Sequence, residues 1–167
     1  MTIPAEIFRA YDIRGIAGKT LTVEAAHAVG RALGSMARAF AVGRDGRASG
    51  PGLVDALCAG LQASGADAID IGMVPTPVTY FAAHHLGCGS CVSVTGSHNP
   101  PEYNGLKMVV EGHTLSGDEI QALRARIERE DFRAGAGPRR SATVLDDYVK
   151  RITGDVRLAR RMRIGQL

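Results

Sequence analysis

The chain has 167 residues, and its 45% hydrophobic and 22% charged content is ordinary for one globular domain with an appendage. No apolar run approaches the ~18 residues that a membrane span needs, and the opening residues lack the long apolar core of a signal peptide. A cytoplasmic protein that does not bind membranes is therefore expected.

Helix and strand patterns alternate through the first ninety residues. Apolar residues recur at helical spacing over residues 22–39, and the apolar run at residues 40–42 predicts a short strand. A second helix is predicted from Ser49 to Gly65, followed by a strand over residues 68–71. A third helix is predicted over residues 75–86, with its prolines in the first turn, where a missing N–H is harmless.

The second half continues with two more strands, at residues 91–94 and 106–110. Their connection is too short for a parallel crossover, so one antiparallel neighbour is expected. Ser116 and Glu119 form a predicted capping box for a helix that includes Ile120, Leu123 and Ile127. A glycine-rich break at residues 135–138 precedes a further short helix at residues 145–152. This alternation predicts the α/β class, with a mixed, mostly parallel four-stranded sheet.

The cysteine count is odd, and Cys88 and Cys91 have the C-x-x-C spacing. That spacing is used in redox motifs and in halves of zinc sites. However, Cys91 opens an apolar strand rather than a helix, where a thiolate would be stabilised, and no second C-x-x-C is present. Reduced, half-buried cysteines are predicted.

The last 35 residues are rich in arginine, including the pairs 139–140 and 160–161. Nucleic-acid binding is one interpretation, but aromatic residues are only 5% of the chain and Trp is absent, so few side chains can stack on bases. A solvated connecting segment is preferred. We therefore divide the chain into an α/β domain, residues 1–133, and a linker with a helical segment, residues 134–167. We expect the sequence to be a piece of a longer chain.

The loop TGSHNP at residues 95–100 carries the chemical interest. Ser97 alone is more often a turn residue than a nucleophile, and an exposed histidine such as His98 is common. Together with Lys107 on the returning strand, however, these residues suit phosphoryl transfer, which depends on electrostatic stabilisation. The backbone N–H groups of residues 96–99 are expected to form an anion-binding nest.

Four stretches resemble signatures of the α-D-phosphohexomutase superfamily, and within it the phosphomannomutase/phosphoglucomutase group. TGSHNP followed by YNGLK at residues 103–107 resembles the phosphoserine loop. FRAYDIRG at residues 8–15, VGRDGR at residues 42–47 with Ser49, and GMVPTP at residues 72–77 resemble three further signatures. All four occur in the order found in the family.

The resemblance implies a three-layer sandwich that is the first of four domains around a cleft. It makes Ser97 the phosphoserine, with Lys107 and His98 as acid/base and charge partners. Arg14 would reach the same cleft, and Tyr11 and Asn99 would contribute to binding substrate or phosphate. The reaction implied is reversible conversion of hexose 1-phosphates to 6-phosphates through a bisphosphorylated sugar.

The resemblance also implies Mg²⁺ between the phosphate on Ser97 and a D-x-D-x-D-R loop of the second domain. That run is absent from this sequence, as are the sugar-reading and phosphate-clamping loops of the third and fourth domains. The partners expected are thus hexose phosphates and the missing domains, and the chain alone is predicted to be inactive. The alternative is a naturally short, non-catalytic module that binds phosphosugars or a partner. The choice between mannose and glucose lies in the absent domains.

Overall fold

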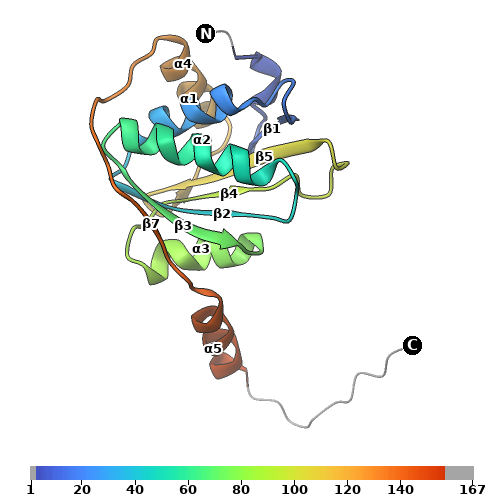
Figure 1. The fold of residues 1–167 in the computed structure, drawn as a ribbon, viewed down its shortest axis with the longest axis vertical. Helices are drawn as coiled ribbons and strands as arrows, with labels where there is room; N and C mark the ends of the chain where they lie inside the picture. Colours follow the sequence, from blue (N-terminus) through green and yellow to red (C-terminus); the bar gives the residue numbers. More distant parts are fainter. Residues whose placement is uncertain (1–2, 157–167) are drawn as a thin grey trace.

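A computed structural model describes residues 3–156, which form a sheet covered by helices on both faces (Figure 1). Within that range the sheet has seven strands: β1 (Ile13–Ile16), β2 (Ala39–Arg44), β3 (Asp67–Met73), β4 (Cys91–Val94), β5 (Tyr103–Val110), β6 (His113–Thr114) and β7 (Arg139–Ser141). The helices are α1 (Val23–Gly34), α2 (Gly50–Ala63), α3 (Thr76–His85), α4 (Asp118–Glu128) and α5 (Leu145–Asp155), after a 3₁₀ turn at Ala5–Ile7.

The strand order is β1-β5-β4-β2-β3-β7, with β6 paired to β5. The four predicted strands are confirmed as its centre: β2 pairs in parallel with β3 and β4, and β5 runs antiparallel to β4. The predicted strand count was wrong, because β1, β6 and β7 were missed. These three strands have two to four residues each, too few for a clear alternating pattern.

The core consists of two apolar clusters separated by the sheet. The larger cluster joins one face to α1, α2 and α4, and the smaller one joins the other face to α3. The helices α1 and α2 cross closely because Gly30 faces the backbone of Leu57 and Gly60 faces that of His27, where a Cβ would overlap backbone atoms. This three-layer arrangement is the predicted α/β class.

Two details at helix ends differ from the predictions. The first predicted helix, residues 22–39, is too long, because α1 ends at Gly34 and its cap residue, Ser35, donates its hydroxyl to the carbonyl of Arg31. Thr22 caps its start by accepting from the N–H of Ala25. The predicted capping box of α4 forms in part. The Glu119 carboxylate accepts from the Ser116 N–H, as predicted, but the Ser116 hydroxyl does not cap the helix. The helix itself starts after Gly117.

The three cysteines are free thiols, as predicted. Burial raises the pKa of the Cys91 thiol to about 12, with a smaller contribution from Cys88, and burial likewise raises the pKa of Cys58 to about 11. A higher pKa disfavours the thiolate, the form that reacts and binds metals. Among residues 3–156, no group of three His, Cys, Asp or Glu side chains could hold a metal ion.

The segment after α4 runs along the sheet to α5, which projects from the body (Figure 1). Several of its arginines are bound internally: Arg139 pairs with Asp55 and Asp70, and Arg133 donates to the carbonyls of Gly34 and Ser64. The pair 160–161 lies outside the described residues. Within the part of the chain that is described, no helix is long and apolar enough to cross a membrane.

Candidate functional site

The strands β1 and β5 bring three charged side chains to one place. Ile13 lies opposite Leu106 in this antiparallel pair, so Asp12, one residue earlier, comes opposite Lys107, one residue later. Arg14 follows two residues after Asp12 and lies opposite Gly105. Because side chains alternate along a strand, Asp12 and Arg14 share one face with Lys107.

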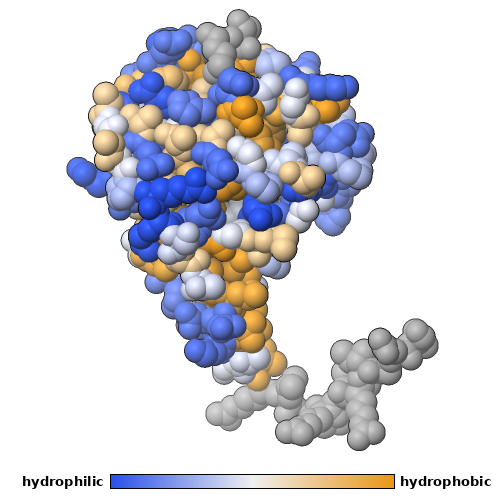
Figure 2. All heavy atoms as spheres, in the orientation of Figure 1, coloured by the Kyte–Doolittle hydropathy of each residue, from blue (hydrophilic) through white to orange (hydrophobic). Residues whose placement is uncertain are grey.

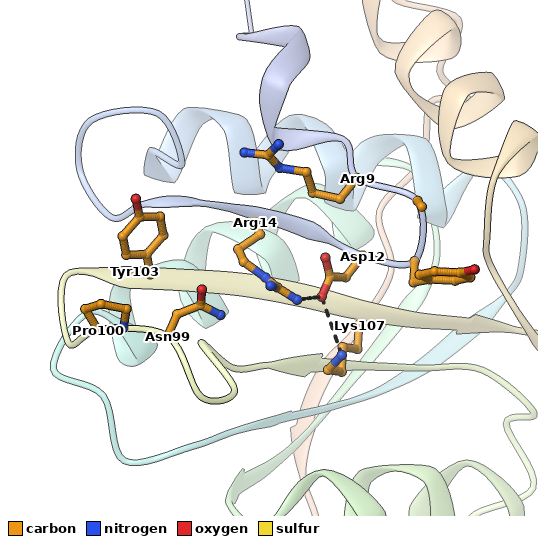
Figure 3. A pocket seen from close by; sticks show the side chains of 9 residues that line it. Arg9, Asp12, Arg14, Asn99, Pro100, Tyr103 and Lys107 are labelled. Carbon is orange, nitrogen blue, oxygen red and sulfur yellow. Dashed lines mark hydrogen bonds and ion pairs between the residues drawn. The ribbon is translucent and has the colours of Figure 1, made fainter.

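These residues border an open hollow of about 720 Å³ (Figure 3). Three cationic side chains and one carboxylate contribute to its lining, so the hollow favours anionic ligands. Four of the six residues proposed from the sequence, Tyr11, Arg14, Asn99 and Lys107, are among the lining residues, and Ser97 and His98 are not. The full lining is Arg9, Ala10, Tyr11, Asp12, Arg14, Asn99, Pro100, Tyr103 and Lys107.

Asp12 is a site residue that the sequence did not single out. Its side chain is only 7% exposed, and one carboxylate oxygen lies 2.5 Å from a guanidinium nitrogen of Arg14 and 3.4 Å from Nζ of Lys107. Figure 3 shows this carboxylate between the two cations. Asp12 thus fixes the two side chains that the sequence proposed for binding phosphate. The available signal was the FRAYDIRG motif at residues 8–15, which contains Asp12 two positions before Arg14.

Replacing Asp12 with Asn should lower the free energy of unfolding by about 1–2 kcal/mol, because Arg14 and Lys107 lose a charged hydrogen-bond acceptor. Urea unfolding measures this difference. Asp55→Asn is the matched control, because the Asp55 side chain is 66% exposed and its partner Arg139 keeps Asp70. An Asp12→Asn variant as stable as the control variant would show that Asp12 does not hold the pair.

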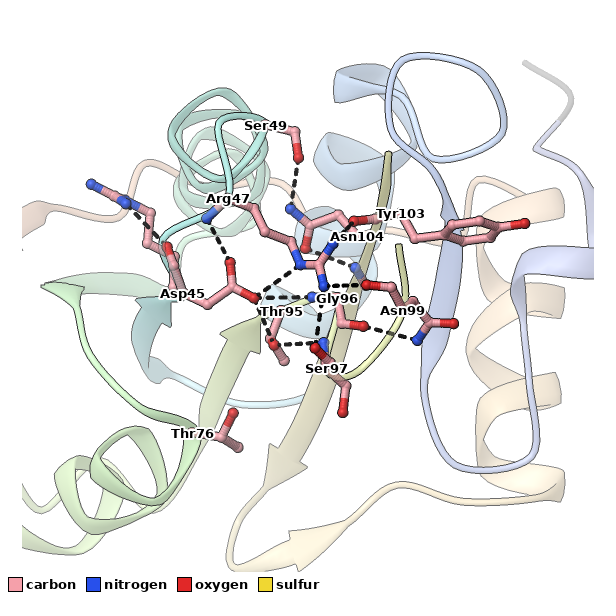
Figure 4. Close-up of polar contacts among 12 residues, drawn as sticks. Asp45, Arg47, Ser49, Thr76, Thr95, Gly96, Ser97, Asn99, Tyr103 and Asn104 are labelled. Atoms are coloured by element: carbon pink, nitrogen blue, oxygen red, sulfur yellow. Dashed lines mark hydrogen bonds and ion pairs between the residues drawn. The ribbon is translucent and has the colours of Figure 1, made fainter. Parts of the chain in front are cut away.

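The Ser97 loop leaves the end of β4 and returns as β5 (Figure 4). Ser97 has a φ of 53°, a left-handed conformation that costs a non-glycine residue about 1–2 kcal/mol. Within residues 3–156 the hydrogen bonds of Ser97 involve its backbone: its N–H donates to the Thr95 hydroxyl and its carbonyl accepts from Arg47. The side chain is exposed, so its hydroxyl is accessible to a reacting group.

The expected anion-binding nest is wrong. Three of its four N–H groups already donate to the protein: Gly96 to the carboxylate of Asp45, Ser97 to the Thr95 hydroxyl, and Asn99 to the carbonyl of Gly96. The sequence showed that the loop contains glycine and polar residues, but it could not show that acceptors within the protein already bind these N–H groups. Any anion at this loop must therefore be held mainly by side chains.

The remaining proposed residues lie at the edges of the site. His98 is exposed beside Ser97, and Tyr11 is 75% exposed. Asn99 is partly buried, and both its side-chain amide and its N–H donate to the carbonyl of Gly96. Its side-chain oxygen is the part that remains to accept a hydrogen bond from a ligand hydroxyl.

The comparisons with known proteins identify the family of this chain. The family described as "Phosphoglucomutase/phosphomannomutase, alpha/beta/alpha domain I" matches residues 5–134. A phosphomannomutase/phosphoglucomutase of Pseudomonas aeruginosa is 52% identical over 98% of the chain, and a phosphoglucomutase of Neisseria meningitidis serogroup B is 49% identical over 98%. The crystal structure of a phosphoglucomutase/phosphomannomutase family protein from Burkholderia thailandensis superimposes with a TM-score of 0.90 at 50% identity, over 95% of this chain.

The chain spans only part of these relatives: 36% of the Pseudomonas protein, 37% of the Neisseria protein and 38% of the Burkholderia chain. The family match over residues 5–134 nevertheless contains β1 to β6, α1 to α4 and the Ser97 loop, and β7 follows it. The chain therefore belongs to the phosphoglucomutase/phosphomannomutase family, whose alpha/beta/alpha domain I it contains.

Proposed function

We propose that this chain is the phosphoserine domain of a phosphohexomutase, which interconverts hexose 1-phosphates and 6-phosphates. The observation that carries the proposal is the Ser97 loop, whose backbone is fixed by hydrogen bonds while its serine side chain is exposed. Two residues of the same loop, Asn99 and Pro100, line the cation-bearing hollow. The names of the similar proteins give the sugars, glucose and mannose. These names do not assign one sugar to this chain.

The proposed reaction moves a phosphoryl group from Oγ of Ser97 to a hydroxyl oxygen of the sugar phosphate. The P–Oγ bond breaks as the new P–O bond forms, the sugar hydroxyl loses its proton, and Oγ of Ser97 regains one. The bisphosphorylated sugar then returns its other phosphate to Oγ in the reverse sense, so the net reaction is an isomerisation. The transferring group carries spread negative charge, which positive side chains stabilise.

Each residue of the site has a proposed part in this reaction. Lys107 lies at the hollow and is the candidate that takes or returns the proton of the sugar hydroxyl. Arg14 presents a guanidinium suited to a phosphate, and Asp12 positions both cations. His98, next to Ser97 in the chain, is the second candidate for proton transfer. Tyr11 and Asn99 supply polar groups around the sugar.

Mg²⁺ fits this proposal only through the phosphate on Ser97. The nearest carboxylate to the loop, Asp45, already accepts hydrogen bonds from Arg47, Thr95 and Gly96. The remaining oxygen ligands would therefore come from outside residues 3–156. The ion would neutralise charge on the transferring phosphoryl group.

We further propose that residues 134–167 lead from this domain to a second domain. The helix α5 has no buried residue, and its apolar side chains recur on one side, visible as the orange strip in Figure 2. These side chains, with that of the cap residue after the helix, are 45–54% exposed, which suits a surface that another domain covers: Leu145, Val149 and Ile152 of α5, and Val156 after it. The family match also ends at residue 134.

The proposal is tested by comparing two proteins in an assay of glucose 1-phosphate and mannose 1-phosphate. The 167-residue chain should show no repeated turnover, because loops that read the sugar are absent from its sequence. The chain extended to the length of its relatives should convert at least one substrate to the 6-phosphate. Failure of the extended chain to convert either sugar would favour the non-catalytic module instead.

A further inference from the structure

We propose that Asp45 and Arg47 are the positioning residues of the Ser97 loop, holding it in the conformation that phosphoryl transfer requires. The proposal rests on the function proposed above and assigns a role to two residues about 50 positions away from Ser97 in the sequence. Both belong to the turn after β2, and Figure 4 shows their side chains directed at the loop.

Arg47 uses every donor it has. Its Nε donates to the carboxylate of Asp45 at 3.3 Å, and its four terminal N–H groups donate to backbone carbonyls of the loop and its return. A guanidinium has five donors, so none remains for a phosphate. The four carbonyls and their distances are Pro100 at 2.6 Å, Asn99 at 2.7 Å, Tyr103 at 3.0 Å and Ser97 at 3.2 Å.

These four carbonyls explain why the loop needs a cation beneath it. Carbonyl oxygens that converge on one point repel each other unless a positive group lies between them. The Arg47 side chain is only 15% exposed, so water could not easily replace its donors. The loop conformation therefore depends on this one guanidinium.

Asp45 fixes the other side of the loop. One of its carboxylate oxygens accepts from the Thr95 hydroxyl at 2.9 Å and from the Gly96 N–H at 3.2 Å, and Thr95 in turn accepts from the Ser97 N–H at 2.9 Å. Ser97 is thus held through its N–H by the Asp45–Thr95 chain and through its carbonyl by Arg47. This double constraint accounts for a serine that remains in a left-handed conformation.

Gly96 supports the same interpretation. A Cβ at this position would overlap the guanidinium of Arg47, so only glycine leaves room for the group under the loop. Gly96→Ala therefore provides a second variant that displaces the guanidinium without changing Arg47 itself. Gly96→Ala and a substitution of Arg47 therefore both test whether the guanidinium holds the loop, and each does so by a different change.

The first test is amide hydrogen exchange on the 167-residue chain. Arg47→Lys keeps the charge but has three donors on one nitrogen and cannot bind four separate carbonyls. We expect it, and Gly96→Ala, to speed exchange of the Asn99 and Tyr103 amides at least ~10-fold, because both amides are bonded within the loop. Arg44→Lys is the matched control, since within residues 3–156 the Arg44 side chain donates only to the carbonyl of Asp45, and it should leave both amides unchanged.

The second test measures turnover in the extended chain. Arg47→Lys and Gly96→Ala should lower kcat about 10–10²-fold, the scale of a misplaced reacting group, with KM nearly unchanged, and Arg44→Lys should not. Unchanged loop exchange in both variants would overturn the proposal. Faster exchange spread evenly over β2, β4 and β5, or loosened loops with normal turnover, would also overturn it. Normal turnover of a Ser97→Ala variant would instead refute the proposed function, whatever the exchange shows.

Discussion

Ser97→Ala in the extended chain should lower turnover at least ~10³-fold, because it removes the oxygen that we propose carries the phosphoryl group. The fold should survive, since Ser97 is exposed and is held through its backbone. The free energy of unfolding should change by no more than about 0.5 kcal/mol. A coupled assay of 6-phosphate formation and a urea titration measure the two quantities.

The control for this variant is Ser141→Ala, a second exposed serine, on β7. It should keep both activity and stability. Substantial activity in Ser97→Ala would exclude Ser97 as the phosphate carrier. A loss of activity that follows a fall in the unfolding midpoint would make Ser97 a structural residue.

Lys107→Arg in the extended chain should lower turnover at least ~10²-fold, within the range for loss of general acid–base catalysis. Arginine keeps the positive charge and binds phosphate, but its guanidinium does not deprotonate in proteins. The variant therefore separates charge from proton transfer. Its contact with the carboxylate of Asp12 should persist, because arginine also pairs with carboxylates.

Lys19→Arg is the control, since Lys19 is exposed in the turn after β1. Ser97 in Lys107→Arg should still be phosphorylated, which mass analysis of the loop peptide checks. Near-normal turnover would assign Lys107 a purely electrostatic role. The proton transfer would then be assigned to His98.

Much of the fold could be predicted because its central elements are long or strongly apolar. The three helices α1 to α3 and the strands β2 to β5 each carry several buried apolar residues in a regular pattern. The antiparallel return of β5 followed from a connection too short to cross the sheet. The short strand β1 could not be predicted in this way, since its four residues depend on pairing with β5.

The candidate site was predictable where its residues lie near Ser97 in the sequence, or in a motif for which the family resemblance implies a role, as with Tyr11 and Arg14. Lys107 pairs with Ser93, because the short connection after β4 makes β5 return antiparallel beside it. The position of Lys107 near the loop could therefore be predicted from the length of that connection. The parts played by Asp45, Arg47 and Ser49 did not follow, although the motif that contains them was recognised. Arg47 contacts carbonyls 50 to 56 positions away, and Ser49 accepts from Asn104, 55 positions away. Such contacts exist only once β2, β4 and β5 are assembled.

Whether Ser97 carries the phosphoryl group is tested by the mass of the extended chain after exposure to glucose 1,6-bisphosphate. We expect an increase of ~80 Da, one phosphoryl group, that peptide mapping places on Ser97 of the extended chain. The increase should be lost on addition of excess hexose monophosphate, which accepts the group, and should be absent in Ser97→Ala. A phosphoryl group that maps to another residue would show that Ser97 is not the carrier. So would a Ser97 that the bisphosphate leaves unmodified in an extended chain that is active in the coupled assay.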